Sequence, residues 1–147
     1  MMDREPISAE IEFAVEFYDV DPMQVVWHGN YVKYFEKARC ALLDSIGYGY
    51  LQMIETGYVY PVTNISLKYI GPFKFGEMVR AKAILEEYEN CLKIKYELRN
   101  AKTGEIRTKG GSTQMAMKMD TGESCFACPQ VFIDRVEAIF KLRDGAQ

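Results

Sequence analysis

The sequence predicts an α+β fold in which a five-stranded antiparallel sheet wraps around one long helix. Two observations predict it: five segments alternate between apolar and polar residues, and one segment near the N-terminus has helical spacing. The helix has one apolar stripe and the sheet has one apolar face, so each must bury that face against the other. With 147 residues, 48% of them hydrophobic and 27% charged, the chain is long enough for one core. We therefore expect residues 1–147 to form a single domain.

The first strand and the long helix follow each other along the chain. Residues 10–18 alternate, with Ile11, Phe13, Val15 and Phe17 on one face, which predicts a strand. Residues 30–46 then repeat apolar positions every three or four residues, which predicts an amphipathic helix. That apolar stripe consists of Val32, Phe35, Ala38, Leu42 and Ile46. Asn30 is the expected N-cap, and Gly47 is the expected left-handed residue after the helix.

Four more strands and a final helix account for the rest of the chain. We expect the strands at residues 62–70, 78–86, 91–99 and 106–119, and an amphipathic helix over about residues 129–141. Short turns at Glu89-Asn90 and Lys102–Gly104 predict antiparallel hairpins. Gly110-Gly111 predicts a bulge or bend within the last strand.

The overall charge and the apolar runs argue against two classes of partner. The net charge is −3, whereas a nucleic-acid binder usually shows a basic domain or stripe. No apolar run approaches the roughly 20 residues of a membrane span, so we expect no membrane partner. Residues 1–12 contain four acidic side chains and no apolar run, which is unlike a signal peptide. We therefore expect a cytoplasmic protein.

The cysteines and glycines predict no cofactor and no metal. Cys125 and Cys128 form a lone C-x-x-C, whereas a structural zinc site needs four ligands, typically from a second such pair. We expect reduced thiols that pack as small apolar groups just before the final helix. No phosphate-binding glycine motif is present, which argues against a nucleotide cofactor.

The connection between the first strand and the long helix contains the candidate chemistry. It holds Asp19, Asp21 and His28, the only histidine, and it ends at a helix N-terminus. The free N–H groups and dipole of such a terminus favour a developing oxyanion, and a carboxylate nearby serves as nucleophile or general base. This pair suits a thioester, because the thiolate leaving group needs little acid assistance. Acidic residues before a helix are also common caps, so the residues alone leave that interpretation open.

The same stretch resembles a known family. The pattern D-x-D-x-x-x-x-V-x-H-x-N-Y is similar to that of hotdog-fold acyl-CoA thioesterases of the 4-hydroxybenzoyl-CoA thioesterase type, including the bacterial YbgC-like branch. It is formed here by Asp19, Asp21, Val26, His28, Asn30 and Tyr31. The helix continuation Tyr34–Arg39 is similar too, and the order of elements matches from about residue 10 to residue 119. The resemblance implies an acyl-CoA thioesterase with the hotdog fold.

The resemblance also implies a catalytic pair. Asp21 is the expected nucleophile or general base, and the helix N-terminal N–H near His28 is expected to polarise the thioester carbonyl. The His28 side chain is expected to line the acyl or pantetheine pocket, while Asp19 orders the loop. Gln24 stands where relatives frequently have glycine.

The expected substrate contacts involve a second subunit. The strand at 62–70 has the character of a covered edge, so we expect a homodimer or homotetramer. In hotdog relatives two subunits join edge to edge, which implies that Asp21 of one chain faces residues 58–64 of the other. The expected contacts to the acyl-CoA substrate are Tyr31, Tyr60, Pro61, Val62, Thr63, Lys68 and Arg80. The CoA phosphates are expected at Lys68, Lys74 or Arg80, or at a neighbouring subunit.

Three alternative functions stay open at this stage. The chain is also compatible with an acyl-CoA-binding hotdog module without turnover, or with a thioesterase that acts on acyl carrier protein. A hotdog hydratase ranks last, because seven positions separate Asp21 from His28 and the asparagine and proline of the hydratase motif are absent.

Overall fold

The computed structural model describes residues 4–145, and its main layer is a five-stranded antiparallel sheet. The strand order is β1-β4-β5-β6-β3, so β1 and β3 form the two edges. Their bounds are β1 (Ser8–Ala14), β3 (Val62–Tyr69), β4 (Met78–Glu87), β5 (Leu92–Asn100) and β6 (Ile106–Gln114). The predicted hotdog architecture of five antiparallel strands and one central helix is confirmed.

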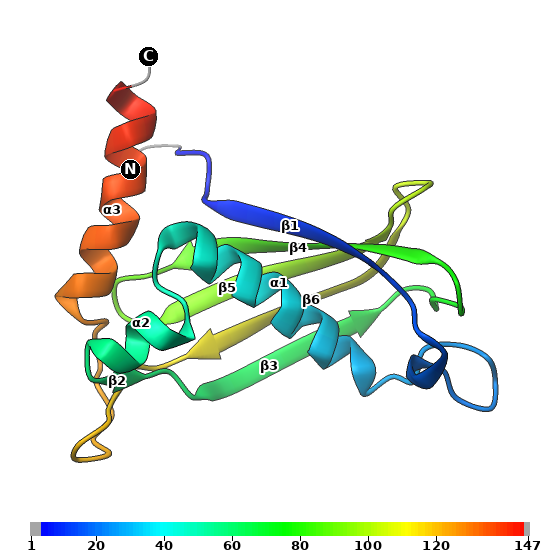
Figure 1. The fold of residues 1–147 in the computed structure, drawn as a ribbon, viewed down its shortest axis with the longest axis horizontal. Coiled ribbons are helices and arrows are strands. Elements are labelled where there is room, and N and C mark those ends of the chain that lie inside the picture. Colours follow the sequence, from blue (N-terminus) through cyan, green and yellow to red (C-terminus); the bar gives the residue numbers. More distant parts are fainter. Residues whose placement is uncertain (1–3, 146–147) are drawn as a thin grey trace.

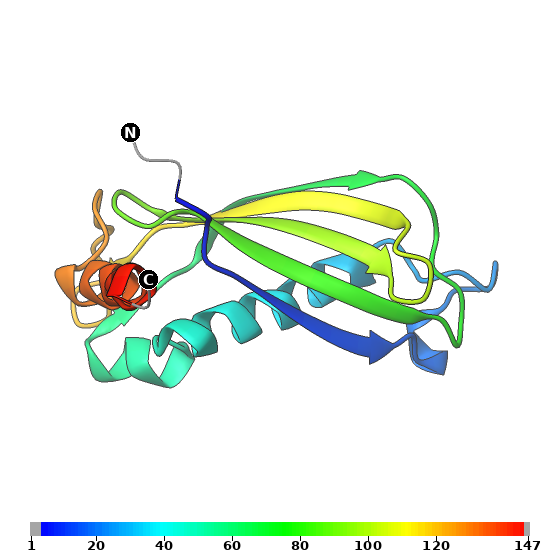
Figure 2. The same cartoon turned by 90° about the horizontal axis from the view of Figure 1, so that it is seen from above.

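The long helix α1 (Asn30–Ile46) lies across one face of this sheet, as Figures 1 and 2 show. The shorter helix α2 (Tyr50–Glu55) follows α1, and the terminal helix α3 (Gln130–Gly145) stands at one end of the sheet (Figure 2). Two short strands, β2 (Tyr58–Val59) and β7 (Met117–Lys118), pair beside α2. Among the described residues, no helix is long and apolar enough to cross a membrane.

The core lies between α1 and the concave face of the sheet. Alternate residues of β4 and β5 are buried there, as their patterns predicted: Val79, Ala81, Ala83, Leu85, Leu92, Ile94, Tyr96 and Leu98. From α1, the Phe35 ring stacks on the Tyr96 ring with centroids 4.4 Å apart. Offset stacking of this kind adds to the hydrophobic gain of burial.

Gly110 has a different role from the one predicted. The β5–β6 register runs through Gly110 and Gly111 without a shift, so the expected bulge or bend is wrong. A Cβ at Gly110 would overlap the Phe35 ring and approach the Ser66 carbonyl oxygen. The glycine is therefore needed because helix and sheet approach closely at this point.

Three other local predictions are corrected by the structure. The first strand ends at Ala14, short of the expected residue 18. Residues 17–19 form a 3₁₀ turn instead, because the Asp19 carboxylate accepts the Glu16 N–H. This turn leaves Phe17 exposed. Asn30 is the first residue of α1 and Gly29 is its N-cap; Asn30 instead donates to the Asp19 carbonyl. The segment 106–119 is two strands, with residues 115–116 between β6 and β7.

The predicted bounds and buried face of the helices agree well with the structure. Gly47 follows α1 with φ +79°, the left-handed conformation expected of it. Four of the five residues in the predicted α1 stripe are buried, whereas Val32 is 38% exposed. The final helix begins one residue later and extends four residues further than the expected range of 129–141.

Candidate active site

A tight hairpin presents Asp21 just before α1. The backbone N–H of Asp21 donates to the Val25 carbonyl and that of Gln24 donates to the Asp21 carbonyl, which closes a loop of three residues. The last loop position, Gln24, has φ +66°. In this class of hairpin that position adopts the left-handed conformation, for which glycine is preferred. Gln24 therefore holds a strained conformation three residues from the candidate catalytic carboxylate.

Asp21 is half-buried, and only one of its two carboxylate oxygens accepts a hydrogen bond. Its Oδ1 accepts the Met23 N–H at 2.9 Å, which orients the carboxylate over the turn. Within residues 4–145, Oδ2 accepts no hydrogen bond and forms no ion pair. One oxygen thus fixes the side chain while the other is free to meet a substrate or a water molecule.

Asp19, by contrast, is buried, and one of its carboxylate oxygens accepts two hydrogen bonds. Its Oδ2 accepts hydrogen bonds from the Glu16 N–H and the Tyr34 hydroxyl, both at 2.9 Å. Its carbonyl accepts the Asn30 side chain at 2.8 Å and the Trp27 N–H at 2.9 Å. Burial and then the hydrogen bond to Asp19 raise the pKa of Tyr34, which keeps that hydroxyl a neutral donor. These contacts fit the ordering role expected of Asp19.

The N-terminus of α1 offers free backbone donors beside this hairpin. The N–H of Asn30 bonds the Trp27 carbonyl at 2.8 Å, whereas the N–H groups of His28 and Gly29 have no acceptor in the described part of the chain. The Trp27 ring packs directly over Gly29, where a Cβ would overlap it. Free N–H groups at a helix N-terminus suit a developing negative charge.

The loop between β3 and β4 holds the hairpin in place. The Val26 N–H donates to the Phe73 carbonyl at 2.8 Å, and the Phe73 N–H donates to the Tyr31 hydroxyl at 3.2 Å. Tyr31 is 3% exposed, so it anchors this loop within the chain instead of presenting its hydroxyl to a cavity. His28 is exposed, and its carbonyl accepts the Tyr69 hydroxyl at 2.9 Å.

A large cavity, of about 810 Å³, lies toward the other end of α1. Its wall contains the predicted residues Tyr60 and Pro61, together with Gln114 from the end of β6. Further lining comes from the C-terminal half of α1, from α2 and from the short strands: Arg39, Leu43, Leu51, Met53, Val59 and Met117. Val62 and Thr63 lie beside it at the exposed start of β3. A cavity of this size and apolar character is typical of a small-molecule site.

The predicted site residues therefore form two groups in this chain. Asp21 and His28 lie at the N-terminal end of α1, whereas Tyr60 and Pro61 lie beside its C-terminal half. A helix of 17 residues is about 25 Å long, so one chain does not bring the groups together.

The two residues expected at the CoA phosphates differ in their surroundings. Arg80 on β4 donates to Glu12 at 2.9 Å and lies 3.8 Å from Glu10, so its charge is already balanced. Lys68 on β3 is exposed, faces Lys109 across the β3–β6 ladder and has no ion pair among the described residues. An anion is more strongly attracted to Lys68 than to Arg80.

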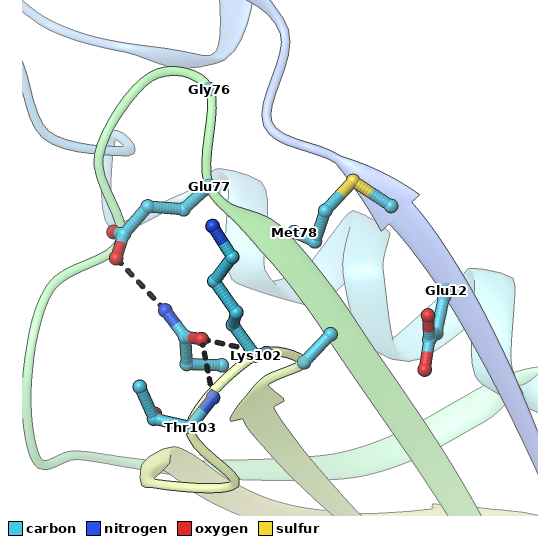
Figure 3. Close-up of a pocket in the computed structure, with 8 residues that line it drawn as sticks. Glu12, Gly76, Glu77, Met78, Lys102 and Thr103 are labelled. Carbon is cyan, nitrogen blue, oxygen red and sulfur yellow. Dashed lines mark hydrogen bonds between the residues drawn. The ribbon is translucent and has the colours of Figure 1, made fainter.

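A second hollow, of about 570 Å³, lies between the start of β4 and the β5–β6 turn (Figure 3). Its polar groups are bonded to one another: Asn100 donates to Glu77 at 2.9 Å and accepts the N–H groups of Lys102 and Thr103. These bonds stabilise the turn and leave no free group of Asn100 aimed at a ligand.

The cysteines are free thiols, and Cys128 is buried. Burial raises the pKa of the Cys128 thiol to about 12, so little nucleophilic thiolate is present at neutral pH.

Sequence patterns missed α2 and Gln114 as parts of the cavity wall. Six residues of helix are too few for a clear period, and nothing in the sequence singled out α2. The sequence of β6 did contain a signal for Gln114. The positions of this strand that face inward carry the polar residues Thr108, Ser112 and Gln114, where apolar residues are usual.

Comparison with known proteins places the chain in one family. The model of the Thioesterase-like superfamily matches residues 15–137. A Bacillus subtilis protein named "Putative acyl-CoA thioesterase YneP" is 28% identical over 111 residues, which are 75% of this chain and 80% of that protein.

Solved structures agree on the architecture. A DHNA-CoA thioesterase from Staphylococcus aureus superposes with a TM-score of 0.80 and 27% identity, over 95% of both chains. A 4-hydroxybenzoyl CoA thioesterase mutant in complex with 4-hydroxybenzoyl CoA shares the fold, with a TM-score of 0.77 and 14% identity over 88% of this chain and 99% of that one. With a family match over most of its length and the matching fold, the chain belongs to the thioesterase-like superfamily of hotdog proteins.

Proposed function

We propose that this protein hydrolyses acyl-CoA thioesters to the free acid and CoA. Two features that are close in the chain carry the proposal. Asp21 has a carboxylate oxygen that accepts no hydrogen bond, and the backbone N–H groups just before α1 have no acceptor among the described residues. The names of the relatives support the same substrate class. A deacylating site needs both elements, a group that activates or supplies the nucleophile and donors for the oxyanion.

Asp21 acts in one of two ways. As a general base, its Oδ2 takes a proton from water, and the hydroxide attacks the thioester carbonyl carbon. As a nucleophile, Oδ2 attacks that carbon itself and forms an anhydride, which water then hydrolyses. In both routes the N–H groups of His28 and Gly29 hold the oxyanion, and the C–S bond breaks to release CoA thiolate. A thiol with a pKa near 8.5 leaves without a strong general acid.

The site is completed by a second copy of the chain. β3 is an edge strand whose Tyr69 end contacts His28, while its Val62 end follows Pro61 of the cavity wall. If two β3 edges pair antiparallel, the His28 end of one chain lies beside the cavity of the other. This arrangement supports a homodimer with two equivalent sites, in which His28, Val62 and Thr63 line the passage between Asp21 and the partner's cavity. Lys68 is the proposed contact for the CoA phosphates, ahead of Arg80, whose charge is already balanced by Glu10 and Glu12.

A hydrolysis screen tests the proposal. Purified protein is assayed with short-chain, long-chain and aromatic acyl-CoAs, and the released thiol is measured. We expect turnover of at least one class and a loss of on the order of a hundredfold or more in kcat for Asp21→Asn. Wild-type rates in Asp21→Asn would reject the catalytic assignment, and binding of every acyl-CoA without turnover would favour the non-catalytic module.

The carrier of the acyl group is tested with the same screen. Acyl-CoA and acyl carrier protein with identical acyl groups are compared by kcat/KM. The proposal expects the CoA thioester to be preferred, and a strong preference for the carrier protein would replace it with the rival substrate.

A further inference from the structure

Among the described residues that line the large cavity, Arg39 of α1 is the only cation. Much of the wall around it is apolar, with Leu43, Met53 and Met117 among the lining residues. The Arg39 side chain is 17% exposed, so most of it is withdrawn from water while part of it still faces open space. A largely buried charge is costly unless it is paired and hydrogen-bonded.

Arg39 has few partners within the chain. Glu36 is the only carboxylate within 4 Å of it among residues 4–145, and the two side chains are 3.6 Å apart. That distance is longer than a hydrogen bond, and 62% of the Glu36 side chain is exposed, so the pair is weak. The guanidinium also lies near the Tyr96 hydroxyl, which is bonded to the Ser112 hydroxyl at 2.7 Å. Two neighbours leave several of its five N–H donors without an acceptor in the described chain.

The other acidic residue of the wall is directed elsewhere. Asp44 lies five positions after Arg39, about 7.5 Å further along the helix axis. A Cβ at Gly49 would overlap the Asp44 carboxylate, which therefore lies beside the start of α2. Asp44 is exposed, so water and salt screen its charge. A carboxylate that reaches Arg39 through the cavity is therefore not opposed by a buried negative charge.

We propose that Arg39 is a specificity-determining residue that selects acyl groups with a free carboxylate at the end distant from the thioester. The proposal rests on the proposed function, because it needs the acyl group to enter this cavity. A planar guanidinium matches a carboxylate, and two parallel N–H···O bonds would satisfy donors that the chain leaves free. An acyl group that ends in a methyl group leaves the same cation unpaired. A charge-assisted hydrogen bond accounts for a preference of about tenfold or more.

Matched pairs of thioesters test the proposal. The pairs are hexanoyl-CoA with adipoyl-CoA, and octanoyl-CoA with suberoyl-CoA, which differ only at the distant carbon. We expect the wild-type protein to favour the dicarboxylic member of at least one pair by about tenfold or more in kcat/KM. In Arg39→Met the ratio should fall to one or below, because the carboxylate would lose water without gaining a partner. Arg39→Lys keeps the charge without the planar fork and should retain part of the preference.

Lys37→Met is the matched control. Lys37 is also a cation of α1, but it is exposed, lies over the Phe13 ring and does not line the cavity. Its substitution changes the net charge by the same amount as Arg39→Met, so it should leave the preference unchanged. An equal loss of preference in both variants would overturn the proposal, because it would show a general effect of charge.

Three further results would overturn the proposal. The first is a wild-type protein that favours the dicarboxylic member of neither pair, which decides the matter even if Arg39→Met fails to fold. The second is an unchanged preference in a folded Arg39→Met. The third is turnover of other acyl-CoAs but of none of these four.

A binding measurement separates this inference from the proposed function. If no acyl-CoA is hydrolysed at all, the proposed function fails, and calorimetry with the same four thioesters decides the role of Arg39. Tighter binding of a dicarboxylic thioester than of its monocarboxylic counterpart, lost in Arg39→Met, supports that role. Equal binding within both pairs, or no binding of any of the four, overturns it.

Discussion

The two ends of α1 are stabilised by different interactions. At the N-terminal end, Asp19 and the hairpin around Asp21 are held by hydrogen bonds, and Gln24 is strained. At the C-terminal end, Tyr48, Tyr60 and Phe132 pack with ring centroids 5.2 to 6.0 Å apart, and Tyr60 also lines the cavity. Directional bonds position a reacting group, whereas apolar packing shapes a pocket. Under the proposed function, the reacting groups and the acyl pocket of one chain therefore lie at opposite ends of α1.

The largest expected effect removes packing at the C-terminal end. Phe132 of α3 is fully buried against the two tyrosines, so Phe132→Ala should cost about 3–5 kcal/mol of folding free energy. No charged group is lost, so the cost should be the same at pH 5 and pH 8. Urea denaturation at both values measures it, and a strongly pH-dependent cost would break the comparison between the two ends.

The next effect removes the polar anchor of the N-terminal end. Asp19→Ala leaves the Glu16 N–H and the Tyr34 hydroxyl without their acceptor, which should cost about 2–3 kcal/mol of stability. Tyr34→Phe, which removes only one of these bonds, is the control and should cost less. Thermal unfolding and kinetics on the same samples separate the roles. A stable Asp19→Ala protein without turnover would transfer the catalytic role from Asp21 to Asp19.

Relief of strain should act in the opposite direction. Gln24→Gly places the residue that tolerates φ +66° at the left-handed position of the hairpin, and should stabilise the protein by about 1 kcal/mol. Gly47→Ala at the end of α1 is the converse control, because it introduces a side chain at φ +79°. Destabilisation by Gln24→Gly would show that the Gln24 side chain contributes more than its conformation costs.

The smallest effect concerns pH. Burial alone would raise the pKa of Glu77, but hydrogen bonds from the Lys74 N–H, Arg107 and Asn100 lower it below its usual range. A lowered folded-state pKa contributes stability above the unfolded value of about 4.3, and this is lost as pH falls through the folded value. Glu77→Gln should therefore cost about 0.5–1 kcal/mol at pH 7, since Glu77 is partly exposed.

Denaturation of both proteins at pH 7 and pH 3 tests the role of Glu77. The difference in stability between wild type and Glu77→Gln should shrink at the lower pH. A difference that grows at pH 3 would contradict the assignment of the lowered pKa.

Local patterns predicted what depends on near neighbours. The alternation of β5 and the spacing of α1 identified buried faces that the structure confirms, and Gly47 has its expected conformation. Gly110 could not be assigned in this way, because a glycine suits a bulge and a close helix contact equally well. The choice depended on Phe35, which lies 75 positions earlier in the chain.

The cavity was beyond local patterns for the same reason. Its wall combines α1, α2, β2 and the end of β6, so it exists only after distant segments pair. Asp21 could be singled out as a candidate from the sequence because it lies in the contiguous connection between a strand and a helix.

The central claim is that Asp21 of one chain works on an acyl group held in the cavity of its partner. Two variants are co-expressed with different affinity tags: Asp21→Asn, and Cys40→Trp, which places a large side chain at an exposed position of the cavity wall. Each variant alone should be inactive. A purified mixed dimer contains one site with both parts intact, so it should show about half of the wild-type activity per dimer. A mixed dimer no more active than the separate variants would contradict the shared site.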